Sequence, residues 1–225
     1  PQQQREQYVY LPFEVPAGAR RIEVSYFYEH QVQGAQETHA GNNIDIGVFD
    51  ARGADFLRGG FRGWSGGART GFYIDGDAAT PGYLRGPIQP GEWSIIFGCS
   101  KIETDVANYR VNIDVEIDPA SEGDPVADVV VPGMPRAEIV GGMPGVASHA
   151  AAGGAAGRWY RGDLHAHSEH SDGANTVDEI IDYTRRVNLD YFALTDHNTL
   201  SHWNDLARLN TGAAATPRLV DGEEV

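Results

Sequence analysis

The stretch Tyr191-Phe-Ala-Leu-Thr195 is uncharged, and Asp196 and His197 follow it directly. An apolar run of this length is typical of a strand buried on both faces, as in a parallel sheet. Segments with strand and helix patterns alternate around it, which is the arrangement of α/β folds. The stretch therefore predicts an α/β unit in the C-terminal part of the chain.

Two further strands are predicted beside this one, at Asp163-Leu-His-Ala-His167 and at Arg218-Leu-Val220. Thr176-Val-Asp-Glu179 is a capping box and predicts the start of a first helix. A second helix is predicted after His197, with leucines and a tryptophan along one side. Residues 158–225 therefore predict the first βα units of an α/β barrel or of a doubly wound sheet.

Histidines and carboxylates gather at the ends of the predicted strands. His165 and His167 are two residues apart, so on a strand their side chains project from the same face. Ser171-Asp-Gly173 is a turn that can fold back toward them, His197 ends the second strand, and Gly222-Glu-Glu224 follows the third. Because the C-terminal ends of parallel strands share one rim, these groups should converge. We expect the three histidines to share a metal site.

Imidazole and carboxylate ligands without a thiolate suit zinc, manganese or iron rather than calcium. Each ligating imidazole also needs an acceptor on its other nitrogen, for which Asp163 and Asp196 are candidates. His170 either reaches the same site or is solvated in its loop, and we favour solvation in the loop. His202 lies off the apolar side of the second helix and is predicted to be on the surface.

These residues resemble the motifs of the PHP superfamily, named for polymerase and histidinol phosphatase. Arg161-Gly-Asp-Leu-His-Ala-His-Ser168, together with Ser171-Asp-Gly173, resembles the first motif. Leu194-Thr-Asp-His-Asn198 resembles the second, and Asp221-Gly-Glu-Glu224 resembles the start of the third. The resemblance implies a distorted α/β barrel in the C-terminal part of the chain.

The resemblance also implies a set of metal ligands: His165, His167, Asp172, His197 and Glu224. Glu224 rather than Glu223 matches the carboxylate that bridges two metals. The implied activity is that of a metal-dependent hydrolase of the phosphoesterase type, acting on a small-molecule phosphoester. Its di- or trinuclear centre of zinc, manganese or iron would activate water, so His165, His167, His197 and Glu224 would be catalytic through the metal.

A PHP barrel continues well past its third motif, and further ligands come from that region. The chain ends one residue after Glu224. We therefore expect the active site of this chain alone to be incomplete. A downstream or second polypeptide is expected to complete the barrel.

Residues 8–118 have a different pattern, in which short alternating strands are separated by turns rich in Gly and Pro. Tyr109–Ile117 is the clearest, since every odd position is apolar and every even position is polar. This pattern predicts an antiparallel β-sandwich or jelly roll without a catalytic role, with the odd face of 109–117 buried. The segment Pro81–Trp93 resembles part of the N-terminal domain of the PHP branch that includes carbaryl hydrolases.

The chain is thus expected to be an α+β multidomain protein. A β-sandwich domain is predicted at 1–118, a linker rich in Pro, Gly and Ala at 119–157, and the N-terminal portion of a PHP metallohydrolase domain at 158–225. Within the linker, Val129-Val-Val131 could add an edge strand.

Composition excludes several classes of protein. The chain has 225 residues, with 32 Asp and Glu against 17 Lys and Arg, for a formal net charge of −15. That charge repels phosphate backbones, so nucleic acid is an unfavourable partner. The single Cys99 excludes an internal disulfide framework. There is no apolar run of the roughly 18–20 residues that a membrane span needs. The residues from Pro1 onward do not have the charged-then-apolar pattern of a signal peptide, and we expect a cytoplasmic location.

Two alternatives to a phosphoesterase remain open. The same metal site could serve a carbamate or ester hydrolase. The chain could instead be a non-catalytic binding or assembly module with an incomplete PHP domain. Trp64, Tyr73, Tyr83 and Trp93 could stack on sugars in such a module, although packing in a core is the favoured interpretation.

Overall fold

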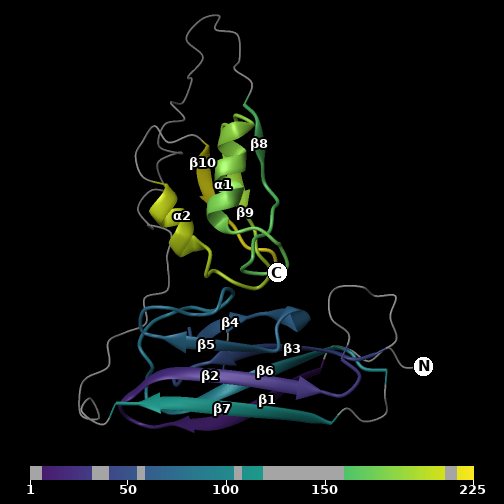
Figure 1. Cartoon of the computed structure of the whole chain (residues 1–225), viewed down its shortest axis with the longest axis vertical. Coiled ribbons are helices and arrows are strands. Elements are labelled where there is room, and N and C mark those ends of the chain that lie inside the picture. The colour runs from purple at the N-terminus through teal and green to yellow at the C-terminus, as the bar shows by residue number, and fades with distance from the viewer. Residues whose placement is uncertain (1–6, 32–40, 55–58, 104–107, 119–159, 211–216) are drawn as a thin grey trace, which may run out of the picture. The chain divides into compact units, whose positions relative to one another are not determined.

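The computed structural model describes residues 7–31, 41–54, 59–103, 108–118, 160–210 and 217–225 (Figure 1). The chain divides into two compact units, Pro1–Val130 and Val131–Val225. The predicted linker, including Val129–Val131, lies outside the described residues.

The first unit contains two antiparallel sheets (Figure 1). One has the strand order β1 (Gln7–Val15), β6 (Gly91–Lys101), β3 (Asn43–Phe49), β4 (Phe61–Trp64). The other has the order β5 (Gly71–Asp75), β2 (Ala19–Tyr28), β7 (Tyr109–Ile117). A 3-10 helix, η2 (Gly66–Ala68), lies between β4 and β5. The prediction of a β-rich, antiparallel N-terminal region is confirmed.

Side chains from both sheets pack into one hydrophobic cluster. Ile22 and Val24 of β2 meet Ile46 of β3 and Ile95 of β6 in this cluster. Alternation of apolar and polar residues therefore provides the core, because each strand turns one face toward it. Tyr83 and Trp93 are buried there, as favoured above for these aromatics, with relative exposures of 3% and 0%.

Strand β7 follows the predicted alternation only in part. Its even-numbered residues are exposed, and Val111, Ile113 and Val115 are half-buried against the core. Tyr109 and Ile117, at the two ends of the strand, are exposed instead of buried. β7 pairs with β2 from Tyr109 to Ile117, so its odd-numbered face is covered at the centre of the strand and open at the two ends.

The first unit also buries a pair of opposite charges. Arg62 and Asp50 are fully buried, with 3.3 Å between Nη1 of Arg62 and Oδ2 of Asp50. The guanidinium also donates to the backbone carbonyls of Leu84, Gly86 and Pro87. Burial lowers the pKa of Arg62 to about 10, against the opposing effect of Asp50. These bonds tie the segment 84–87 to β4 and supply the donors and acceptors that buried charges require.

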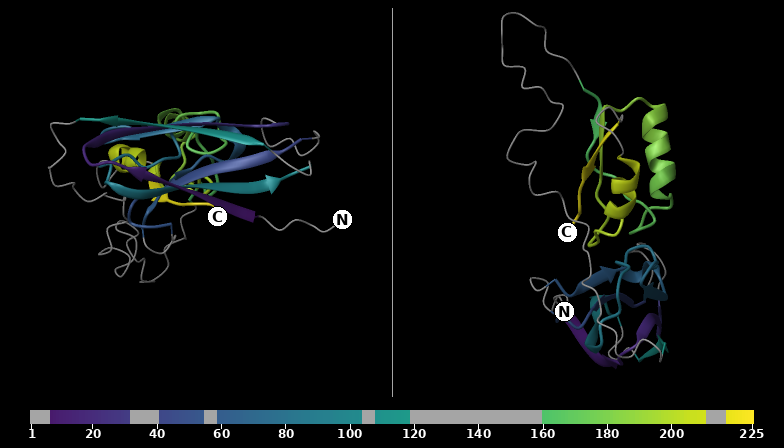
Figure 2. Two further views of the ribbon diagram at one scale, coloured as in Figure 1. Left: turned by 90° about the horizontal axis from the view of Figure 1, so that it is seen from below. Right: turned by 90° about the vertical axis from the view of Figure 1, so that its left-hand side faces the viewer.

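The second unit has a three-stranded parallel sheet in the order β10 (Arg218–Asp221), β9 (Tyr191–Leu194), β8 (Gly162–Asp163). Two helices, α1 (Val177–Arg186) and α2 (Trp203–Leu209), lie on the same side of this sheet (Figure 2). Within the described residues, no helix is long and apolar enough to cross a membrane. As predicted, β9 is a buried strand with parallel neighbours on both sides.

The helix start predicted at Thr176 is confirmed in detail. The Thr176 hydroxyl accepts from the backbone N–H of Glu179, and the Glu179 carboxylate accepts from the backbone N–H of Thr176. From this capping box, α1 turns Val177 and Ile181 toward Leu194 of β9 in a second hydrophobic cluster.

The strand predicted at 163–167 is shorter than expected, because β8 ends at Asp163. The carboxylate of Asp163 accepts a hydrogen bond from the backbone N–H of His165 at 3.1 Å. A local turn of this kind competes with the strand ladder. Beyond Asp163, a backbone hydrogen bond still joins the two segments, because Thr195 N donates to the carbonyl of Ala166 at 2.8 Å.

On the first unit, the close packing of Trp64 across two glycines leads to a test. A Cβ atom at Gly47 would lie 2.6 Å from Cε3 of Trp64 and 2.8 Å from the carbonyl oxygen of Gly63, and one at Gly98 would also meet the indole. We expect Gly47→Ala to lower the free energy of unfolding by about 1–3 kcal/mol through overpacking. Denaturant unfolding measures this change.

Gly76→Ala is the matched control, since a Cβ atom there meets nothing within 4 Å. It should change the free energy of unfolding by less than about 1 kcal/mol. Equal stability of the two variants would contradict the packing described for Trp64.

Candidate metal centre

The continued pairing of β9 brings three segments together just past the strand ends. Thr195 bonds to Ala166, so His165 and His167 stand on either side of that contact. On the other edge, His197 forms a parallel bridge with Glu224, and Asn198 N donates to the Glu224 carbonyl at 2.9 Å. Backbone hydrogen bonds thus place the ends of all three predicted strands side by side.

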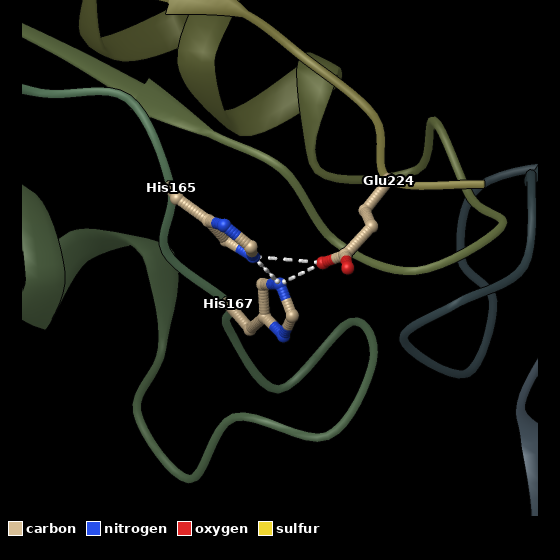
Figure 3. Close-up of side chains that lie close together, drawn as sticks. All are labelled: His165, His167 and Glu224. Carbon is tan, nitrogen blue, oxygen red and sulfur yellow. Dashed lines mark hydrogen bonds and ion pairs between the residues drawn. The ribbon is translucent and has the colours of Figure 1, made fainter.

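His165, His167 and Glu224 form the tightest group (Figure 3). Nε2 of His165 lies 3.1 Å from Nε2 of His167, and Oε2 of Glu224 lies 2.8 Å from the first and 2.7 Å from the second. The side chain of His165 is 66% exposed and that of His167 is 18% exposed, so the group opens to solvent on the His165 side.

A second group combines His167, Asp172 and His197. Oδ1 of Asp172 lies 2.7 Å from Nδ1 of His167, and Oδ2 of Asp172 lies 3.9 Å from Nε2 of His197. Nδ1 of His197 also lies 3.7 Å from Oε2 of Glu224. The structure therefore brings together all five side chains that the resemblance implied. Glu223 belongs to neither group, and burial raises the pKa of its carboxyl.

The donor atoms fit a divalent cation. An ionised Asp172 can only accept, so Nδ1 of His167 donates to it, and the lone pair on Nε2 faces His165 and Glu224. Three acceptor atoms at such short range require a proton or a cation between them. Ligands of a four-coordinate ion at about 2.0–2.2 Å are about 3.3–3.6 Å apart, so a small outward shift would accommodate one.

The charges in the cluster shift the pKa values of its members. Burial opposes the charged form of His167, but the hydrogen bonds and charges of Asp172 and Glu224 outweigh it and raise the pKa of His167. Burial raises the pKa of Asp172, and contact with His167 and His197 outweighs this and lowers it. Desolvation is the largest single influence on Glu224 and raises the pKa of its carboxyl, but the three histidines together outweigh it and lower that pKa. Both carboxylates are thus held in the charged form that binds cations.

A tight turn holds Asp172 in place. Its backbone is closed by hydrogen bonds to the Ser168 carbonyl from Ser171 N at 3.1 Å and from Gly173 N at 2.9 Å. A Cβ atom on Gly173 would lie 2.2 Å from the carbonyl oxygen of His167, so this turn requires glycine at that position.

Neither acid suggested as the acceptor for an imidazole fills that role. Asp163 accepts from the backbone of His165, and Asp196 accepts from Ser168 and Ser171. The acceptor for His167 is Asp172 instead. The two serines carry no metal-binding chemistry, and their bonds to Asp196 span about one βα unit, so sequence patterns did not indicate this role for Asp196.

The expectations for two other histidines were wrong. His170 is not solvated, because its side chain is 11% exposed and its Nδ1 lies 2.6 Å from Oγ of Ser201. His202 is fully buried rather than on the surface. Helix α2 starts only at Trp203, so His202 precedes it and its Nε2 contacts the carbonyl of Gly222 at 3.1 Å.

Residues 163–219 match the family model described as PHP domain. The matched range includes His165, His167, Asp172 and His197, and it ends before Glu224. No curated protein and no solved structure matches the chain. The match supports membership in the PHP superfamily and, at that level, suggests a metal-dependent hydrolase of the phosphoesterase type.

The turn at Gly173 provides a test of the site geometry. Gly173→Ala should lower the free energy of unfolding by at least about 1–3 kcal/mol, because the new methyl group overlaps the backbone of His167. The measurement is denaturant unfolding of the metal-free protein. Ala174→Ser, at the exposed neighbouring position, is the control and should have little effect. Equal midpoints for the two variants would show that the turn is not packed as described.

Proposed function

We propose that the second unit binds divalent metal ions and that the protein hydrolyses a small-molecule phosphoester. The observation that carries the proposal is the convergence of Nε2 of His165, Nε2 of His167 and Oε2 of Glu224 within 3.1 Å of one another. Asp172 and His197 complete the proposed ligand set. Imidazole and carboxylate donors favour zinc, manganese or iron.

Each proposed ligand has a distinct part in the site. His165 and His167 direct nitrogen lone pairs toward the same point, and Asp172 fixes the orientation of the His167 ring. Oε2 of Glu224 faces His165 and His167 at hydrogen-bonding distance and His197 at 3.7 Å, which suits a carboxylate shared between two ions. Bound divalent cations would supply Lewis-acid stabilisation of a phosphoryl group and promote the ionisation of water.

The charge of the chain supports a role for cations in substrate binding. A formal net charge of −15 repels a phosphoester, and Asp172 and Glu224 add negative charge at the site itself. Metal cations would offset this repulsion where the substrate binds. The exposed side of His165 leaves access for a small molecule.

We also propose the finer assignments for the fold. The parallel order β10-β9-β8, with both helices on one side, is what the start of a distorted PHP-type barrel would have. The two antiparallel sheets with one hydrophobic cluster are what a β-sandwich would have, and we assign this unit to the branch that includes carbaryl hydrolases. That assignment keeps an ester or carbamate as the second candidate substrate.

The proposal is tested by metal analysis and hydrolysis assays. The protein is stripped with a chelator, reloaded with zinc or manganese, and assayed on p-nitrophenyl phosphate, p-nitrophenyl acetate and an aryl carbamate. We expect bound metal and metal-dependent release of phosphate. Glu224→Gln should lower the rate more than about 100-fold, since loss of a ligand exceeds the 10- to 100-fold effect of outer partners.

Glu223→Gln is the matched control, because Glu223 is the neighbouring acid and lies outside both groups. It should keep most of the metal and the activity. Turnover of the ester or the carbamate alone would favour the second candidate. Metal binding without any turnover would support a binding module, and a protein that takes up no metal would refute the metal site itself.

A further inference from the structure

Asp196 is the most heavily hydrogen-bonded acid beside the metal centre. Its side chain is fully buried. Its carboxylate accepts from Ser168 N at 2.7 Å, Ser168 Oγ at 2.7 Å and Ser171 Oγ at 2.6 Å. A buried carboxylate is costly unless such donors surround it, so these three bonds fix where the serines lie.

Each group in this network is next in sequence to a proposed metal ligand. Asp196 precedes His197, Ser168 follows His167, and Ser171 precedes Asp172. The hydrogen bonds therefore connect the segment just past β9, which carries His197, to two serines of the turn that carries Asp172. Within the described residues, no backbone hydrogen bond joins this turn to the segment past β9 beyond Ala166, so Asp196 provides the link past that point.

A buried histidine lies between this network and the segment that carries Glu224, although its Nδ1 has no hydrogen-bond partner among the described residues. Nδ1 of the buried His202 lies 3.3 Å from Oδ2 of Asp196, and its Nε2 lies 3.1 Å from the carbonyl oxygen of Gly222. Trp203 donates to the same carbonyl through Nε1 at 3.0 Å. Asp196 thus lies among all three segments that supply ligands.

Asp196 contacts the serines beside the proposed ligands rather than the imidazoles of the ligands. Its carboxylate oxygens accept hydrogen bonds from these serines in the interior. The proposed ligands Asp172 and Glu224, by contrast, have side chains that are 56% and 36% exposed. We infer that Asp196 is a positioning residue that holds Asp172 opposite His197 and so determines whether these two side chains bind a second metal ion. This inference rests on the proposed function, since it requires that the centre binds metal.

The two groups of ligands should respond differently when the network is cut. His165, His167 and Glu224 are held by pairing with β9 and need no bond from Ser171. Asp172 depends on the turn that Ser171 anchors. Ser171→Ala and Asp196→Asn should therefore weaken binding of the second metal ion by about 10- to 100-fold, the usual effect of losing an outer-shell partner. Binding of the first ion should weaken by clearly less, since Asp172 affects it only through the His167 ring.

The experiment titrates metal-free protein with Co²⁺ and follows the visible absorption of the bound ion, with bound metal counted by elemental analysis. Thermal unfolding of each metal-free variant is recorded in parallel. Ser201→Ala is the matched control, because Ser201 is a buried serine of the same unit whose hydroxyl contacts His170 and Thr199 rather than Asp196. Ser171→Thr keeps the hydroxyl and should restore the wild-type titration.

The outcomes separate the inference from the proposal on which it rests. If Ser171→Ala and Asp196→Asn bind cobalt as the wild type does, the inference is overturned and the proposed metal centre is not affected. Equal weakening of both ions, in step with a lower melting temperature, would also overturn it, because it would show a general structural role. If Asp196→Asn does not fold, Ser171→Ala decides alone, as Ser171 is only partly buried. A wild-type protein that binds no cobalt would refute the proposed function itself.

Discussion

A carboxylate removed from water must be surrounded by hydrogen-bond donors, and in the second unit this requirement applies to Asp196. The donors come from a turn about one βα unit earlier in the chain, so satisfying one acid aligns two segments that would otherwise be independent. Pairing of β9 with its two neighbours aligns the rest. We infer that the exposed groups of the candidate metal centre take their positions from an acid whose own side chain is fully buried.

The first unit meets the same requirement without building a site. Arg62 and Asp50 are buried together, and backbone carbonyls accept the remaining hydrogens of the guanidinium. Among the described residues, the groups that could hold a metal ion all lie in the second unit. Burial of charge thus stabilises a loop in one unit and orders a ligand set in the other. The difference is that Asp196 and the serines that bond to it are each next in sequence to a proposed metal ligand.

Local patterns in the sequence were sufficient to predict β9, the capping box of α1 and the meeting of the histidines. Each depends on residues close in sequence or on the rule that parallel strand ends share a rim. The errors arose where a side chain acts on distant backbone or interrupts a strand. Asp163 ends β8 early through its own turn, and His202 precedes α2 and is buried against the carbonyl of Gly222. The partners of Asp196 were not foreseeable, since serines are compatible with almost any surface position.

The indole of Trp64 lies across Gly47 and Gly98, where there is no room for a Cβ atom. Three positions, which come from three different strands, therefore share one volume. A smaller residue at 64 would free that volume and permit a side chain at 98, whereas a Cβ atom at 47 would still lie 2.8 Å from the carbonyl oxygen of Gly63. Among related chains, we expect positions 64 and 98 to covary, and we expect glycine at 47 whichever residue stands at 64.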